Sequence, residues 1–235
     1  MIRKLIILVA ASVPFLFASC GGKELNPDIP EEFFPVAVDL GLTVKWADRN
    51  VGAYEPEENG TYYVSWGETA LSRNYAWGNY KWCKGSSTSL TKYNTDPTLG
   101  VVDNKTKLEA NDDVATVKYG GKWRMPTVDD LNELAATKDN PDYKWEWKLT
   151  YNHNGWEVLG WEITYLVNGN SIFLPAASYI NGDTGGSYEY GYYWSSSLNL
   201  DFPVNAWSLT FSAEGVHVEK LLARFHGFPI RAVCD

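Results

Sequence analysis

The stretch GGKWRMPT (Gly120–Thr127) marks a sharp change from extended backbone to helix. Pro126 disfavours helical backbone at the residue before it, so the segment leading into it should be extended. Thr127 then occupies an N-cap position, and Asp130 follows three residues later in the acidic variant of a capping box. Behind the cap, apolar residues recur at helical spacing, namely Val128, Leu131, Leu134 and Ala135. The sequence therefore predicts one capped amphipathic helix over about residues 127–138.

The rest of the chain has the alternation and turn residues of short antiparallel strands. Asn154-Gly155 and Asn168-Gly169 are pairs that supply the positive φ angles of tight hairpin turns. Strand-like segments occupy residues 36–46 with a break at Gly41, and also 61–66, 144–151, 156–165, 171–174, 192–197, 206–211 and 228–233. We therefore expect an α+β fold that is mainly antiparallel β and carries the single helix.

Residues 67–108 show no sustained period and are rich in Gly, Ser, Asn and Thr. A long irregular segment inside a compact domain is unusual and is often functional. The alternative is a loop that is held in place by its own aromatic residues, which are Tyr75, Trp77, Tyr80 and Trp82.

Composition excludes several classes of function. The chain has 235 residues, a formal charge of −9 and an aromatic content of 15%, with 11 Trp and 15 Tyr. Nucleic-acid binding needs clustered Lys and Arg, which an acidic domain of this kind lacks. The chain also has no basic run that would hold an anionic membrane surface. Three cysteines are too few for a disulfide scaffold or a zinc framework.

The N-terminus has the pattern of a bacterial lipoprotein signal. Arg3 and Lys4 precede an apolar run and small residues that end at Cys20. Phe17-Ala18-Ser19-Cys20 resembles a lipobox; the alternative is an ordinary signal peptide with a chance cysteine. We expect a signal peptide at 1–19, a lipidated tether at 20–35 and one domain at 36–235. Lys23-Glu24 resembles export signals of some outer-membrane lipoproteins, so we expect the outer membrane and the cell surface.

Catalytic patterns are not found in the sequence. Residues 195–197, three consecutive serines, lack the Gly-x-Ser-x-Gly elbow of hydrolases. His153, His217 and His226 show no metal-ligand spacing. We therefore expect a protein that is not an enzyme, with no catalytic residue, no metal and no cofactor.

Two further groups of residues allow a functional and a structural interpretation. The carboxylates of Glu109, Asp112 and Asp113 could bind calcium, or they could form a solvated turn or a hydrogen-bond cluster. Exposed Trp and Tyr could stack on sugar rings, whereas core packing is the default for aromatic residues in strands. We expect core packing for one group of tryptophans, which are Trp145, Trp147, Trp156 and Trp161.

Several motifs together resemble one family. They are Val38–Ala47, Trp66–Thr69, Tyr80–Cys83, Val102–Lys105, Asp112–Ala115, Gly120–Thr127, Asn170–Ala177, Tyr193–Ser197 and Ile230–Val233. This set resembles the Fibrobacter succinogenes major paralogous domain of secreted and lipid-anchored Bacteroidetes proteins, and the resemblance covers residues 36–235. It implies a C-type-lectin-like fold of the formylglycine-generating type, in which the two chain ends pair. The formylglycine-generating reaction needs a pair of active-site cysteines that we cannot match here, so the resemblance does not carry the activity over.

One departure from the family concerns the cysteines. Relatives often place a cysteine where this chain has Arg49. The resemblance then leaves Cys83–Cys234 as the one remaining disulfide, which spacing alone neither supports nor excludes.

The resemblance also implies that the irregular C-terminal half builds the ligand surface. The expected ligand-binding residues are Asn199, Asp201, Phe202, Asn205, Ser208, Thr210, Glu214, His217, Phe225, His226 and Phe228. Alternation places Trp207, Leu209 and Phe211 toward the core and Ser208 and Thr210 away from it. Some C-type-lectin-like proteins are targets of diversity-generating retroelements, which vary positions of this kind.

The expected function is therefore that of a non-catalytic surface lipoprotein. It would bind a protein or cell-surface ligand through the C-terminal surface, with Phe202, Phe225 and Phe228 as apolar anchors in a polar rim. The alternative is a glycan-binding module for polysaccharide capture. Neither expectation includes a nucleic-acid partner.

Overall fold

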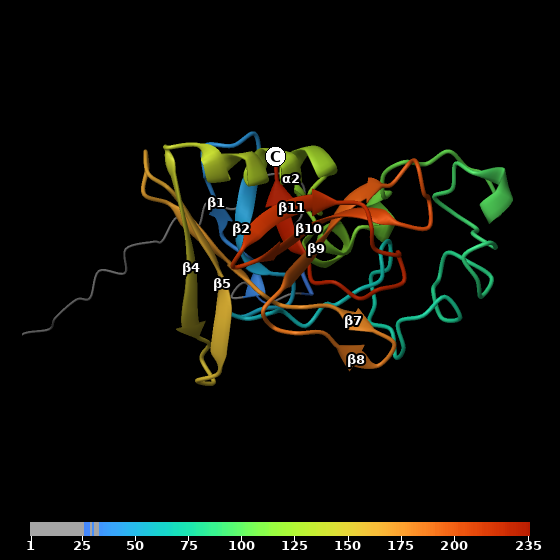
Figure 1. Ribbon diagram of the computed structural model, residues 1–235, viewed down its shortest axis with the longest axis horizontal. Coiled ribbons are helices and arrows are strands. Elements are labelled where there is room, and N and C mark those ends of the chain that lie inside the picture. The colour runs from blue at the N-terminus through green and yellow to red at the C-terminus, as the bar shows by residue number, and fades with distance from the viewer. Residues whose placement is uncertain (1–25, 29, 31–32) are drawn as a thin grey trace, which may run out of the picture.

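The protein is mainly antiparallel β with few short helices (Figure 1). The computed structural model describes residues 26–28, 30 and 33–235, so the predicted signal peptide, Cys20 and most of the tether lie outside the described residues. The strands are β1 (Ala37–Val38), β2 (Lys45–Asn50), β3 (Trp123–Arg124), β4 (Tyr143–Tyr151), β5 (Glu157–Tyr165), β6 (Ser171–Pro175), β7 (Ile180–Asn181), β8 (Thr184–Gly185), β9 (Gly191–Leu198), β10 (Ala206–Ser212), β11 (Gly215–Glu219) and β12 (Arg231–Cys234). The helices are α1 (Val114–Tyr119) and α2 (Val128–Ala136), with 3₁₀ turns at Pro97–Leu99, Ala110–Asp112 and Thr137–Asp139.

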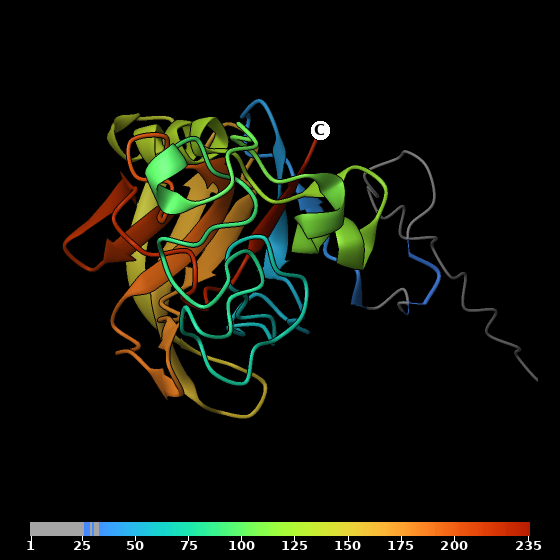
Figure 2. The same cartoon turned by 90° about the vertical axis from the view of Figure 1, so that its right-hand side faces the viewer.

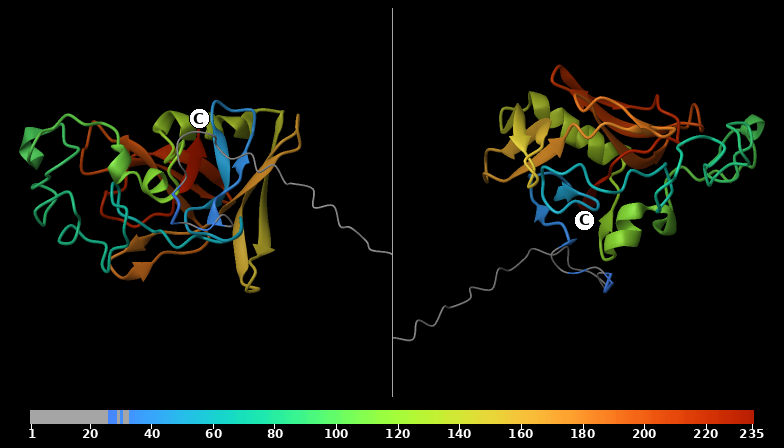
Figure 3. Two further views of the ribbon diagram at one scale, coloured as in Figure 1. Left: turned by 180° about the vertical axis from the view of Figure 1, so that it is seen from behind. Right: turned by 90° about the horizontal axis from the view of Figure 1, so that it is seen from below.

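The strands form four small sheets, ordered β1-β2-β12-β3, β11-β10-β9, β4-β5-β6 and β7-β8. In the first sheet β12, at the C-terminus, pairs with β2 on one side and β3 on the other. The two ends of the domain therefore lie side by side, as Figure 3 shows from below. The pairing of chain ends that the resemblance implied is present.

The predicted helix and its cap are confirmed. The side-chain oxygen of Thr127 accepts the N–H of Asp130, and the carboxylate of Asp130 accepts the N–H of Thr127 at 2.7 Å, which completes the capping box. Arg124 donates to the same carboxylate at 2.7 Å and so ties the strand before Pro126 to the helix behind it. Leu131 and Leu134 are buried, and α2 lies across β9–β11 (Figure 2).

Helix α1 was not predicted. It has only six residues, and Val114, Thr116 and Val117 are β-branched, which weakens helix propensity. Val114, Ala115 and Tyr119 are buried in a core, and Asp113 caps the helix: its carboxylate accepts the N–H of Thr116 at 3.0 Å and that of Met125 at 2.8 Å. This contact between α1 and the segment before Pro126 is not visible in a local pattern.

The two predicted Asn-Gly turns are present. Gly155 and Gly169 have φ angles of +76° and +77°, and they close the β4–β5 and β5–β6 hairpins. Trp161 is buried and lies edge-on to Trp145 and Trp147, with ring centroids 5.8 and 5.4 Å apart. Core packing is therefore correct for these three, but it is wrong for Trp156, which stands beyond the paired strands at the hairpin end.

The irregular segment 67–108 is a loop held by its own aromatic residues. Tyr80 donates to the carbonyl of Trp66 at 2.7 Å, and the Trp82 indole donates to that of Gly67 at 2.8 Å. From the C-terminal side, buried Arg224 donates to the carbonyl of Tyr93 at 2.8 Å. The segment forms the lobe opposite the β4–β5 hairpin, in blue-green to green in Figure 1. The expected strand at 61–66 is wrong, because only Val64 makes a bridge there, with Phe228.

The sheet β9–β11 separates two hydrophobic cores. Tyr193, Leu209 and Phe211 belong to the core that includes α2 and the β4–β6 sheet. Trp194 and Leu198, on the opposite face of β9, belong to the core around Trp66 and the chain ends. When both faces of a sheet are covered, the alternation of polar and apolar residues along a strand no longer indicates which face is exposed to solvent.

Removal of the cap of α2 should destabilise the domain. Thr127→Ala leaves the N–H of Asp130 without its acceptor, so the free energy of unfolding should fall by about 0.5–2 kcal/mol. Thr127→Ser keeps the oxygen and should retain most of that stability. Urea unfolding of the two variants tests this, and equal midpoints would show that the capping bond contributes nothing.

Candidate functional site

A groove of about 980 Å³ opens on the described part of the surface. Three segments form it: residues 52–61 after β2, the end of the β4–β5 hairpin around residues 149–159, and residues 187–189 before β9. Ala176 and Leu159 line it as well, and the N–H of Ala176 donates to the carbonyl of Leu159 at 2.7 Å. The groove thus lies on paired backbone and is built from parts of the chain that are distant in sequence.

Three large aromatic side chains stand exposed along the groove. Tyr54, Tyr188 and Trp156 have exposed fractions of 59%, 63% and 72%, in that order. Trp156 follows the Asn154-Gly155 turn, and its N–H donates to the side chain of Asn152 at 3.0 Å, which fixes the backbone at the hairpin end. Tyr54 packs against Phe33 with ring centroids 4.7 Å apart. All three side chains leave most of their surface to solvent.

The polar lining of the groove is acidic. It contains Glu57, Glu58, Glu157 and Glu189 together with the amides of Asn59 and Asn152, and no Lys or Arg is among the described lining residues. The loop that carries Asn59 closely approaches the end of β2, since a Cβ at Gly60 would lie 3.0 Å from Cβ of Asn50 and 2.6 Å from the carbonyl oxygen of Val51, the next residue. Gly60 also has a φ of +81°, so glycine is required at this point.

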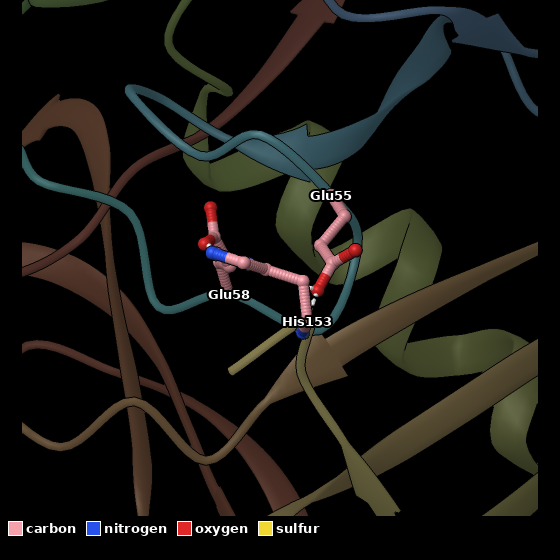
Figure 4. A group of neighbouring side chains, drawn as sticks. All are labelled: Glu55, Glu58 and His153. Atoms are coloured by element: carbon pink, nitrogen blue, oxygen red, sulfur yellow. Dashed lines mark hydrogen bonds and ion pairs between the residues drawn. The ribbon is translucent and has the colours of Figure 1, made fainter. Parts of the chain in front are cut away.

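One histidine and two glutamates meet beside the groove (Figure 4). The Nδ1 atom of His153 lies 2.9 Å from Oε1 of Glu58 and 3.4 Å from Oε1 of Glu55. His153 is in the β4–β5 turn, and the glutamates are in the loop after β2, some 95 residues earlier. Sequence reasoning missed this cluster, because no local spacing relates the two loops.

Five of the expected C-terminal ligand-binding residues are buried. Phe228 stacks on Trp194 with ring centroids 3.9 Å apart, deep in the first core. Ser208 and Thr210 are paired with Trp194 and Tyr192 on the face of β9–β10 that this core covers. The expectation that they face outward is wrong, because both faces of the sheet are packed. Asn199 and His226 are the remaining two.

The buried Asn199 and His226 have structural roles. The Asn199 side chain donates to the carbonyl of Lys220 at 3.0 Å and accepts the N–H of Asp201 at 3.0 Å, so it shapes its own loop. His226 lies next to the carbonyl of Ala223 at 2.9 Å, and burial lowers the pKa of its imidazole. Neither side chain therefore offers its polar atoms to a ligand at the protein surface.

The other expected C-terminal residues remain at the surface to different degrees. Phe225 is half-buried against Trp77 and His226, Asn205 is half-buried, and Trp207, expected in the core, is half-buried too. Four are exposed: Asp201, Phe202, Glu214 and His217. Phe202 stands with Leu200 and Leu221 on two loops that are joined by the Asp201–Lys220 ion pair, and the three have exposed fractions of 58–71%.

The acidic residues considered for calcium are engaged by protein groups. The carboxylate of Asp112 accepts from Lys92 at 2.5 Å and from the Tyr93 hydroxyl at 2.7 Å. Asp113 is the N-cap of α1, and Glu109 pairs with Lys92 and Lys105. Hydrogen bonds from the two lysines hold the pKa of Glu109 at about 2. These carboxylates therefore form a structural hydrogen-bond cluster, which is one of the alternatives to calcium binding that the sequence left open.

The cysteine and serine side chains that could act as nucleophiles also make structural contacts. Cys83 carries a free thiol, with Sγ 3.0 Å from the carbonyl oxygen of Trp77, so the Cys83–Cys234 disulfide is wrong. Ser195 and Ser196 are buried and donate to the carbonyls of Trp207 and Pro126. Ser197 accepts the N–H of Val128 at 3.1 Å at the start of α2.

Among the described residues, none of the helices has both the length and the apolar character needed to span a bilayer. Comparison of the chain with protein-family models, with curated proteins and with solved structures finds no match.

Proposed function

We propose that this protein is a non-catalytic glycan-binding lipoprotein, displayed on the cell surface and taking its ligand into the groove. The observation that carries the proposal is the row of three exposed aromatic rings, Tyr54, Trp156 and Tyr188, along one acidic groove. The C-type-lectin-like fold remains part of the proposal. It is supported by the paired chain ends and by the long irregular segment.

Sugar chemistry matches this lining. A pyranose ring has an apolar face of C–H groups that packs on the electron-rich face of an aromatic ring. Its hydroxyls need acceptors and donors, which the carboxylate of Glu189 and the amides of Asn59 and Asn152 provide. A volume of 980 Å³ is at the upper end of the range for small-ligand sites, about 300–1,000 Å³, so two or three linked sugars would fit.

The groove is favoured over the C-terminal surface for a physical reason. A binding surface needs side chains that a ligand can reach, and five of the eleven expected C-terminal residues are buried. In the groove, by contrast, the aromatic rings are exposed although most other aromatic residues of the chain pack in the two cores. The three rings belong to neither core, which supports a role in binding.

Trp156→Ala should weaken glycan binding without loss of stability. A lost stacking contact should lower affinity roughly tenfold or more, which corresponds to about 1.4 kcal/mol. Tyr151→Ala is the matched control, because Tyr151 is exposed on the same hairpin but does not line the groove. Affinity electrophoresis in a panel of soluble polysaccharides measures both. Retardation of wild type that the two variants retain equally would contradict the groove as the site.

A second candidate is a protein ligand held by the apolar cluster of Leu200, Phe202 and Leu221. Exposed apolar side chains around an ion pair have the composition of a small interface. Of the ligand-binding residues expected from the sequence, this second candidate site includes Phe202 and Asp201 and excludes Phe228.

Stability measurements separate these two phenylalanines. Phe228→Ala should cost about 3–5 kcal/mol as a core truncation. Phe202→Ala should change the free energy of unfolding by less than about 0.5 kcal/mol. On an array of secreted and surface proteins, only the Phe202 variant would then lose a partner while still folded. A melting temperature for the Phe202 variant as low as that of the Phe228 variant would place Phe202 in the core.

Display at the membrane depends on Cys20, which lies outside the described residues. Cys20→Ala should move the protein from the detergent phase to the aqueous phase in Triton X-114 partitioning, since the acyl chains hold the protein in the membrane. Cys83→Ala is the control and should stay in the detergent phase. Detergent partitioning of the Cys20 variant would contradict lipidation.

A further inference from the structure

The cluster of Glu55, Glu58 and His153 brings together an imidazole nitrogen and two carboxylates from two separate loops (Figure 4). Their ligand atoms all lie within 4.8 Å of one another. Zn²⁺ takes such ligands at about 2.0–2.2 Å, and in a tetrahedral arrangement ligand atoms at that distance are separated by roughly 3.3 Å. Nδ1 of His153 lies 2.9 and 3.4 Å from the two carboxylate oxygens, which is close to that separation.

Backbone groups orient both carboxylates. Oε2 of Glu58 accepts the N–H of Tyr54 at 2.5 Å, which leaves Oε1 directed at the imidazole. Glu55 accepts the N–H of His153 itself, so the turn that carries the imidazole also positions the second carboxylate. Outer hydrogen bonds of this kind are what fixes the ligands of a metal site before the metal arrives.

The charge of the groove also favours a cation. The cluster carries two carboxylates, and three more glutamates line the groove near it, which are Glu57, Glu157 and Glu189. No Lys or Arg is among the described lining residues, and the nearby Arg49, which donates to the carbonyl of Tyr54, is paired with Asp48. A divalent cation would neutralise the two glutamates of the cluster and leave the imidazole neutral, which is the form that binds metals.

We propose that Glu55, Glu58 and His153 form a binding site for a divalent transition metal, with Zn²⁺ as the best match. An imidazole ligand disfavours Ca²⁺ and Mg²⁺, which take oxygen ligands. Three protein ligands leave a fourth position open to water or to a ligand. The metal would also join the loop after β2 to the β4–β5 turn, and so hold two walls of the groove together. This site does not depend on the groove's ligand being a glycan.

The competing arrangement is an ion-pair cluster, in which a protonated His153 is held by the two glutamates. It predicts no metal affinity. The side chain of His153 is 47% exposed and that of Glu58 is 16% exposed, so truncation of His153 and the isosteric change of Glu58 should both leave a folded protein. Metal binding can therefore be tested by substitution.

The full chain, purified in detergent and stripped with EDTA, is titrated with ZnCl₂ and separately with CaCl₂ by calorimetry. We expect one equivalent of Zn²⁺ to bind and the melting temperature to rise by roughly 5–10 °C at a hundredfold excess over Kd. His153→Ala and Glu58→Gln should each lower zinc affinity tenfold or more, with unchanged circular dichroism.

Three control variants carry similar groups elsewhere and should bind zinc as the wild type does. They are His217→Ala on β11, Glu146→Gln on the β4–β5 hairpin and outside the groove lining, and Cys83→Ser at the free thiol. The proposal is overturned if no zinc binds, if the His153 variant binds it as tightly as wild type, or if Ca²⁺ binds with the same affinity.

Discussion

The buried guanidinium of Arg231 links β12 to both β2 and β6. It donates to the side chain of Asn50 at 2.8 Å and to the carbonyl of Ala47 at 3.1 Å, both in β2, and to the carbonyl of Phe173 in β6 at 2.7 Å. Burial lowers the pKa of Arg231, yet arginine stays charged in proteins, so these oxygens must satisfy a full charge. Loss of the guanidinium would leave several buried acceptors without donors, a larger cost than one lost hydrogen bond.

The groove depends on the same network. Asn50, held by Arg231, donates to the carbonyl of Asn59 at 3.0 Å and so positions the loop that carries Glu55 and Glu58. Asn50 also donates to the hydroxyl of Tyr193 at 3.1 Å, which in turn donates to the carbonyl of Pro175, next to Ala176 in the groove lining. Two walls of the candidate site are therefore extensions of one buried polar cluster, and such clusters are rigid when every member is satisfied.

The same packing explains why the C-terminal surface is smaller than expected. The sheet β9–β11 lies between two cores. Small hydroxyl residues such as Ser208 therefore occupy a buried face, although the alternation of polar and apolar residues predicts that this face is exposed to solvent. The β4–β5 hairpin, in contrast, extends beyond its pairing with β6, which stops at Gly160. Its turn carries both Trp156 and His153 into solvent, on the wall opposite the loop after β2.

The sequence by itself determined the features that arise from neighbours in the chain. The capping box of Thr127 and Asp130, and the turns at Gly155 and Gly169, are bonds and φ angles among residues at most three positions apart, so their chemistry is complete in a local pattern. Only the tertiary structure decided what is buried and what converges. Phe202 and Phe228 have the same side chain and opposite exposure, because one is in a loop and the other stacks on Trp194 between two sheets. His153 reaches Glu58 across 95 positions for a similar reason: the distance between them is set by the packing of β2, β6 and β12, which no local pattern records.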